Sequence, residues 1–126
     1  MQTLDIAATR TTPGVIYDPA ANRLSLTGQS YPENSFEFYG PIKDWLEELL
    51  EGQPASLLVE FRLDYFNTSS SKCLLDILER LEAHHQQFGN IAIRWYYDSE
   101  DEDMEESGQD FGEDLELPFE LVPCES

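Results

Sequence analysis

Residues 56–89 read SLLVEFRLDYFNTSSSKCLLDILERLEAHHQQFG, and this stretch decides the fold. Its first part, residues 56–66, alternates apolar and polar side chains, which predicts a strand. The apolar face of that strand is formed by Leu57, Val59, Phe61, Leu63 and Tyr65. The second part repeats leucines at helical spacing and ends at Gly89, which predicts a helix that begins within residues 67–72. The buried stripe of this helix is formed by Leu74, Leu75, Leu78 and Leu81.

Two short strands and a helix are predicted before this stretch. The strands cover residues 14–18 and 23–28, with a turn through Pro19 and Asn22 between them. The helix follows, because Asn34 has the offset of a capping box to Glu37 and apolar residues then recur at helical spacing up to Gly52. Gly40-Pro41 interrupts this segment, so either the helix kinks there or a short turn precedes a main helix that opens at Pro41.

The C-terminal third continues the alternation of strands and helices. Residues 90–97 predict a strand, and residues 98–116, which hold eleven acidic and no basic residues, predict a third helix. The narrow apolar seam of that helix consists of Met104, Phe111 and Leu115. Residues 117–122 predict a final edge strand, where Pro118 is tolerated. The resulting order, β-β-α-β-α-β-α-β, is typical of an α/β domain, a mixed sheet with helices packed on it.

Length and charge restrict the classes of partner. The 126 residues fit one domain, which we expect over residues 13–126 after a polar leader at residues 1–12. Seven basic residues oppose 26 acidic ones, for a formal charge of −19. A polyanion of this density does not neutralise phosphates, and an anionic lipid surface repels it. We therefore expect no nucleic-acid partner and no direct membrane binding.

The cellular compartment is predicted from the absence of targeting signals. No apolar run approaches the roughly 18 residues of a membrane span, and the N-terminus lacks the pattern of a signal peptide. Cys73 and Cys124 lie far apart and have no CxxC partner, which favours free thiols over a disulfide. The sequence therefore indicates a cytoplasmic protein.

Catalytic and metal-binding motifs are missing from the sequence. His84 and His85 are adjacent in the last turns of a helix, where surface histidines are common because cations interact well with a helix C-terminus. No glycine-rich phosphate loop occurs. The acidic run at residues 98–103 fails the calcium-loop pattern, because Asp103 stands where the loop turn requires glycine. We therefore expect no enzymatic activity, no metal and no cofactor.

The hydroxyl-rich stretch at residues 67–72 is the most informative feature. It lies where a buried strand runs into a helix, and helix N-termini carry free N–H groups and partial positive charge, so they bind anions. Thr68 at this junction is either a plain capping residue or a place where a phosphate would be tolerated. Asn67 is expected to hold the turn, through an Asx-type hydrogen bond or by adopting an unusual backbone angle.

Four motifs together resemble the SiaC family of bacterial regulatory phosphoproteins. They are Ser30-Tyr31-Pro32-Glu33-Asn34-Ser35, the stretch Tyr65 to Lys72, Trp95-Tyr96-Tyr97-Asp98 and Asp101-Glu102-Asp103-Met104, and the similarity runs from about Thr11 to Pro123. The resemblance implies a fold like that of anti-anti-sigma (STAS) domains and a role in partner switching.

The resemblance also implies a phosphorylation cycle. A dedicated kinase would phosphorylate Thr68, a PP2C-type phosphatase would remove the phosphate, and the unmodified form would activate a diguanylate cyclase in cyclic di-GMP signalling and biofilm formation. Two other functions stay open from the sequence. One is a STAS-like module that acts on a sigma factor or a sensor without a cyclase, and the other is a constitutive acidic scaffold.

The partner-binding surface is expected around Thr68. Tyrosine is enriched at interfaces, which favours Tyr31. The other candidates for partner contact are Glu33, Asn34, Asn67, Ser69 and Ser70, although a capping role alone would explain Asn34. A phosphate on Thr68 would place a dianion in this contact and weaken it.

Overall fold

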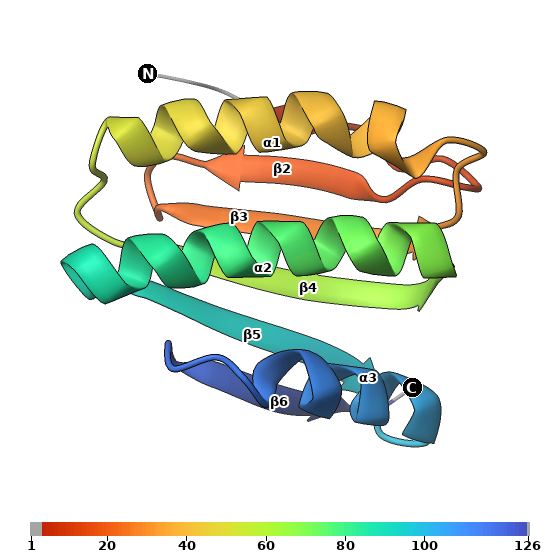
Figure 1. The fold of residues 1–126 in the computed structure, drawn as a ribbon. Coiled ribbons are helices and arrows are strands. Elements are labelled where there is room, and N and C mark those ends of the chain that lie inside the picture. Colours follow the sequence, from red (N-terminus) through yellow and green to blue (C-terminus); the bar gives the residue numbers. More distant parts are fainter. Residues whose placement is uncertain (1–3, 126) are drawn as a thin grey trace.

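A six-stranded sheet carries three helices on one of its faces (Figure 1). The structure, a computed structural model, describes residues 4–125. The elements are β1 (Asp5–Ile6), β2 (Gly14–Asp18), β3 (Arg23–Ser30), α1 (Ser35–Glu51), β4 (Leu57–Phe66), α2 (Thr68–Phe88), β5 (Ile91–Asp98), α3 (Glu102–Gly112) and β6 (Phe119–Cys124).

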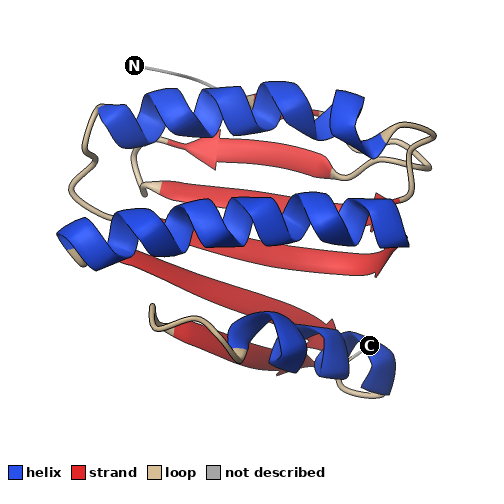
Figure 2. Cartoon of the chain, viewed as in Figure 1, coloured by secondary structure: helices blue, strands red, loops and turns tan. Residues whose placement is uncertain are grey.

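The strands lie in the sheet in their order along the chain. The pairs β1–β2 and β2–β3 are antiparallel, and the three remaining pairs are parallel, each joined by a helix. The three strand–helix–strand crossovers have the same handedness, and each leads to the next strand in the same direction across the sheet. All three helices therefore lie on the same face, as Figure 2 shows. The predicted mixed α/β domain is therefore confirmed. The strand β1, at residues the sequence pattern assigned to the polar leader, pairs with β2 and adds a sixth strand.

The core lies between the sheet and the helices. Leu57, Val59, Phe61 and Leu63 point into it as predicted, but Tyr65 does not and is 52% exposed. The reason is a register shift in the β3–β4 pairing between Gly28 and Gln29, which skips Asp64. Because one extra residue reverses the alternation of side chains, Phe66 packs against the core in place of Tyr65.

The structure decides the alternative that the sequence left open at Pro41, and it differs from the prediction in α2, α3 and the final strand. The helix α1 runs without a break through Pro41, so no separate main helix opens there. In α2 the buried stripe uses Cys73 and Ile77, whereas Leu75 is 42% exposed. The helix α3 is shorter than predicted and ends at Gly112, before Leu115. The final strand begins at Phe119, after Pro118, and its proline is Pro123. No helix among residues 4–125 combines the length and apolar character that a membrane span requires.

Candidate phosphorylation and partner-binding site

The ends of two parallel strands and the starts of two helices meet at one edge of the sheet (Figure 1). Ser30 ends β3 and pairs with Phe66, which ends β4. The backbone N–H of Asn67 donates to the carbonyl of Ser30 at 3.0 Å, which fixes the chain as it leaves β4. The helix α2 begins at the next residue, Thr68.

Asn67 is the N-cap of α2. Its Oδ1 accepts a hydrogen bond from the backbone N–H of Ser70 at 2.9 Å and also from the Ser69 hydroxyl at 3.3 Å. Its backbone is extended, with φ −88° and ψ 177°, so the Asx-type bond is the correct alternative and no unusual angle is involved. Thr68 is therefore the first helical residue and not the cap.

Five hydroxyl groups beside Thr68 form a network, which we call the hydroxyl cluster. It consists of Ser30, Ser35, Tyr39, Ser69 and Ser70. Ser30 Oγ lies 2.6 Å from Tyr39 Oη and donates to Ser70 Oγ at 2.8 Å, and Ser35 Oγ lies 2.8 Å from Ser69 Oγ. Burial raises the pKa of Tyr39 to about 12. The cluster ties β3 and the starts of α1 and α2 together within the protein.

The hydroxyl cluster corrects one predicted partner contact. Ser70 is fully buried, and its hydroxyl is used by Ser30 and Ser35, so it does not reach a partner. Ser69 is half-buried and remains at the margin of the surface. The sequence did not indicate Ser30 or Ser35 as partners of Ser70, because they stand 40 and 35 residues earlier in the chain.

Thr68 differs from Ser69 and Ser70, which follow it. Its side chain is exposed, and within residues 4–125 its hydroxyl has no hydrogen-bond partner. The first turn of α2 contains no acidic residue, so the partial positive charge of this helix end is not compensated by a side chain. The hydroxyl is accessible to an enzyme, and a phosphate on it would lie beside free backbone N–H groups.

The remaining predicted residues lie in the loop between β3 and α1, whose two ends contact the start of α2 through Ser30 and Ser35. Glu33 and Asn34 are exposed, and Asn34 caps α1 by accepting from the N–H of Glu37 at 3.1 Å. The Tyr31 ring meets the Tyr65 ring edge to face, with 5.8 Å between centroids. Tyr65 was missed as a surface residue because its exposure depends on the register shift in β4.

A third aromatic residue is exposed beside the hydroxyl cluster. Phe36 is 59% exposed and follows Ser35, whose hydroxyl contacts Ser69. Exposed aromatic side chains around an accessible hydroxyl are typical of a protein interface.

The histidines and acidic side chains give no second site. His84, expected at the surface, is buried against the Phe88 ring, and burial lowers its pKa. His85 Nδ1 accepts from the backbone N–H of Ile91, so it serves the turn after α2. Among the residues that the structure describes, no group of histidine, cysteine and carboxylate side chains could hold a metal ion.

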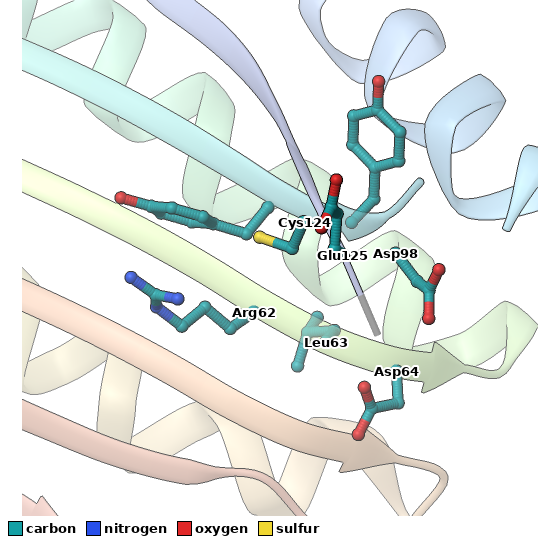
Figure 3. Close-up of a pocket in the computed structure, with 8 residues that line it drawn as sticks. Arg62, Leu63, Asp64, Asp98, Cys124 and Glu125 are labelled. Carbon is teal, nitrogen blue, oxygen red and sulfur yellow. The ribbon is translucent and has the colours of Figure 1, made fainter. Parts of the chain in front are cut away.

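The open face of the sheet has a small hollow of about 210 Å³ (Figure 3). Arg62 lies in it with its guanidinium 3.7 Å from the centre of the Tyr96 ring, and Asp64, Asp98 and Glu125 line the same hollow. One guanidinium and three carboxylates therefore line the hollow, which has no pronounced cationic character.

Comparison with known proteins gives a consistent result. The model of the SiaC family regulatory phosphoprotein matches residues 6–124. An uncharacterized protein of Pseudomonas aeruginosa strain UCBPP-PA14 is 42% identical over 121 residues, which are 96% of each chain.

Two solved structures have the same fold. The crystal structure of apo-SiaC from Pseudomonas aeruginosa matches with a TM-score of 0.89 and 41% identity, over 97% of this chain and 99% of that one. A chain in the crystal structure of the diguanylate cyclase SiaD in complex with its activator SiaC matches with a TM-score of 0.91 and 41% identity, over 96% of this chain and 99% of that one.

These matches cover nearly the whole chain at an identity that shows common family membership. They agree with the mixed α/β domain, whereas the kinship with STAS domains stays a prediction. The protein is a regulator and not an enzyme, and the chain belongs to the SiaC family of regulatory phosphoproteins.

Proposed function

We propose that this chain is a partner-switching activator of a diguanylate cyclase, and that phosphorylation of Thr68 switches it off. A dedicated kinase adds the phosphate and a PP2C-type phosphatase removes it, so cyclic di-GMP synthesis and biofilm formation follow the state of Thr68. The relative named as the activator of SiaD, at 41% identity, supports the cyclase as the target. Because diguanylate cyclases use cytoplasmic GTP, the proposal locates the chain in the cytoplasm.

One observation carries the proposal: Thr68 is the exposed hydroxyl at a helix start where the next two hydroxyls, those of Ser69 and Ser70, are engaged inside the protein. A phosphate there adds about −1.5 to −2 charges and three acceptor oxygens. The N–H groups of α2 stabilise these charges, so the modified domain stays folded. The modification therefore changes what docks on this surface and leaves the fold intact.

The partner surface consists of Tyr31, Glu33, Asn34, Ser69 and Tyr65 around Thr68, with Asn67 holding the loop below it. When a partner covers this surface, the phosphate loses its water and faces aromatic rings and a carboxylate. A buried charge without a partner costs several kcal/mol, which corresponds to a loss of about a hundredfold or more in affinity.

The test uses the chain with phosphothreonine incorporated at position 68 and the diguanylate cyclase of the same organism. We expect the unmodified protein and Thr68→Ala to bind the cyclase and raise its output of cyclic di-GMP. The phosphorylated protein should bind about a hundredfold more weakly by calorimetry. Phosphothreonine at the exposed Thr27, in β3, is the matched control and should bind as the unmodified protein does.

Three results would contradict the proposal. Equal affinity of the unmodified, Thr68→Ala and phosphorylated proteins would exclude the switch. Absence of phosphate on Thr68 in protein purified from its host under several growth conditions would favour the constitutive scaffold. Capture of a sigma-factor regulator instead of a cyclase by the Thr68→Ala protein would favour the alternative target.

A further inference from the structure

The layer of helices is incomplete between α2 and α3. The helices α1 and α2 lie side by side, whereas α3 stands apart from α2 over the β5–β6 edge of the sheet (Figure 1). The space between α2 and α3 forms a groove of about 500 Å³. The groove runs along α2 from Leu75 to Gln86, which is about 16 Å at the rise of an α-helix, or three helical turns.

The floor of the groove is apolar and fixed in shape. Phe111 and Leu115 pack against the core and still line the groove, and Leu75 is 42% exposed at its end nearest Thr68. Glu82 holds the far wall, because its carboxylate accepts hydrogen bonds from the backbone N–H groups of Glu116 and Leu117 at 3.0 Å. The groove is therefore preformed.

The rim of the groove is acidic. Glu79 of α2 and Asp110 and Asp114 on the other side are exposed, and no lysine, arginine or histidine lines the groove. None of the residues that line the groove therefore supplies a positive charge to these carboxylates. Carboxylates on both sides of an apolar floor are complementary to an apolar stripe flanked by positive charges.

We propose that this groove binds a basic amphipathic helix of a partner protein, with the apolar side chains of that helix on Leu75, Phe111 and Leu115 and its lysines or arginines on Glu79, Asp110 and Asp114. The length of about three turns fits a helix laid between α2 on one side and the end of α3 with the segment that follows it on the other. Leu75 lies two turns after Thr68 on the same side of α2, so the groove continues from the surface around Thr68.

The inference does not rest on the phosphorylation of Thr68, because the unmodified chain suffices to test it. The probe is a fluorescent helical peptide of about four turns with leucines on one face and lysines on both flanks. The same peptide with glutamates in place of lysines serves as the negative control. Binding is measured by anisotropy, and the site is located by shifts of the backbone amide signals along α2 and α3.

The charge of the rim is tested with a double reversal. We expect Asp110→Lys/Asp114→Lys to weaken binding of the basic peptide about tenfold or more. Asp44→Lys/Glu51→Lys changes the net charge of the protein equally at exposed positions of α1 and should weaken it less than about threefold. Equal weakening by the two double variants would show nonspecific attraction and overturn the proposal.

The apolar floor is tested with a pair of equally exposed residues of α2. Leu75 and Phe88 are both 42% exposed, but only Leu75 lines the groove. Leu75→Gln should weaken peptide binding about threefold to tenfold, while Phe88→Gln leaves it unchanged. Equal binding by Leu75→Gln and wild type, or amide shifts confined to elements other than α2 and α3, would overturn the groove as the site. Failure of the Thr68 switch with the cyclase would leave these peptide results standing.

Discussion

The starts of α2 and α3 are alike in their caps and opposite in their charge. Each helix follows an Asx residue whose side chain accepts the N–H three residues later, from Asn67 to Ser70 at 2.9 Å and from Asp101 to Met104 at 3.0 Å. The first turn of α2 has no acidic residue, whereas that of α3 has Glu102, Asp103 and Glu105. The positive end of α3 is therefore compensated by its own side chains, and that of α2 is not.

This difference explains why a phosphate would be accepted at α2. At α3 it would join a cluster of carboxylates and be repelled, whereas at α2 it would meet free N–H groups and no acidic side chain of the first helical turn. The two helices are also attached differently. The hydroxyl cluster holds the start of α2, and close packing of Gly108 against Trp95 holds α3.

Gly108→Ala tests the attachment of α3 and should have the largest effect. A Cβ at this position would lie 2.5 Å from Cδ1 of Trp95 and 2.6 Å from Cδ2 of Leu121, so α3 must move away from the sheet. We expect a loss of about 3 kcal/mol in the free energy of unfolding, in spite of the better helix propensity of alanine. Urea unfolding measures it, with the exposed neighbour Gln109→Ala as control. Equal stability of the two variants would show that α3 is not held by this contact.

Alkaline unfolding tests the hydroxyl cluster that holds the start of α2. The pKa of Tyr39 is raised from 10.0 to about 12, so the folded state favours the neutral phenol. Its contribution is complete below pH 10 and is lost as the pH rises from 10 to 12, because the unfolded state releases the proton first. We expect this to lower the free energy of unfolding by about 2 kcal/mol across that range.

Two variants isolate the contribution of Tyr39 from that of the other tyrosines. Tyr39→Phe should have a shallower decline of stability between pH 10 and 12, although it also loses the hydrogen bond to Ser30. Tyr65→Phe, at an exposed position, should keep the wild-type slope. If stability declined equally steeply with pH in wild type and Tyr39→Phe, burial of this phenol would not be the cause of the decline.

The sequence predicted the features that depend on nearby residues. The Asn34 cap, the Asx-type hydrogen bond considered for Asn67 and the glycine that ends α2 are set within a few residues, so local chemistry indicates them. The cap of α2 is nevertheless Asn67, one residue before the threonine to which the sequence pattern gave that role. The features that depend on a distant strand or helix were missed. The exposure of Tyr65 requires the bulge opposite Gly28, and the burial of Ser70 requires Ser30 and Ser35.

Two further features were hidden from local patterns for the same reason. The strand β1 has two residues, too few to show an alternation, and exists because it pairs with β2. Gly108 stands in an acidic helix, where a glycine alone predicts only weak propensity, and its role depends on Trp95 in β5.

Exchanging charge at the two caps tests the comparison itself and should have the smallest effect. Asn67→Asp keeps the hydrogen bond to Ser70 and adds a negative charge at the uncompensated end of α2, so it should stabilise the protein by about 0.5 kcal/mol. Asp101→Asn loses a favourable charge on α3 but relieves repulsion from Glu102 and Asp103, so its effect should be close to zero.

Urea unfolding in low salt and in about 1 M salt separates the effects of charge from those of the hydrogen bonds, since salt screens exposed charges and should remove the gain in stability of Asn67→Asp. Equal and opposite effects of the two exchanges would mean that the acidic residues of α3 do not compensate its helix end, and the electrostatic preference for a phosphate at α2 would lose its basis.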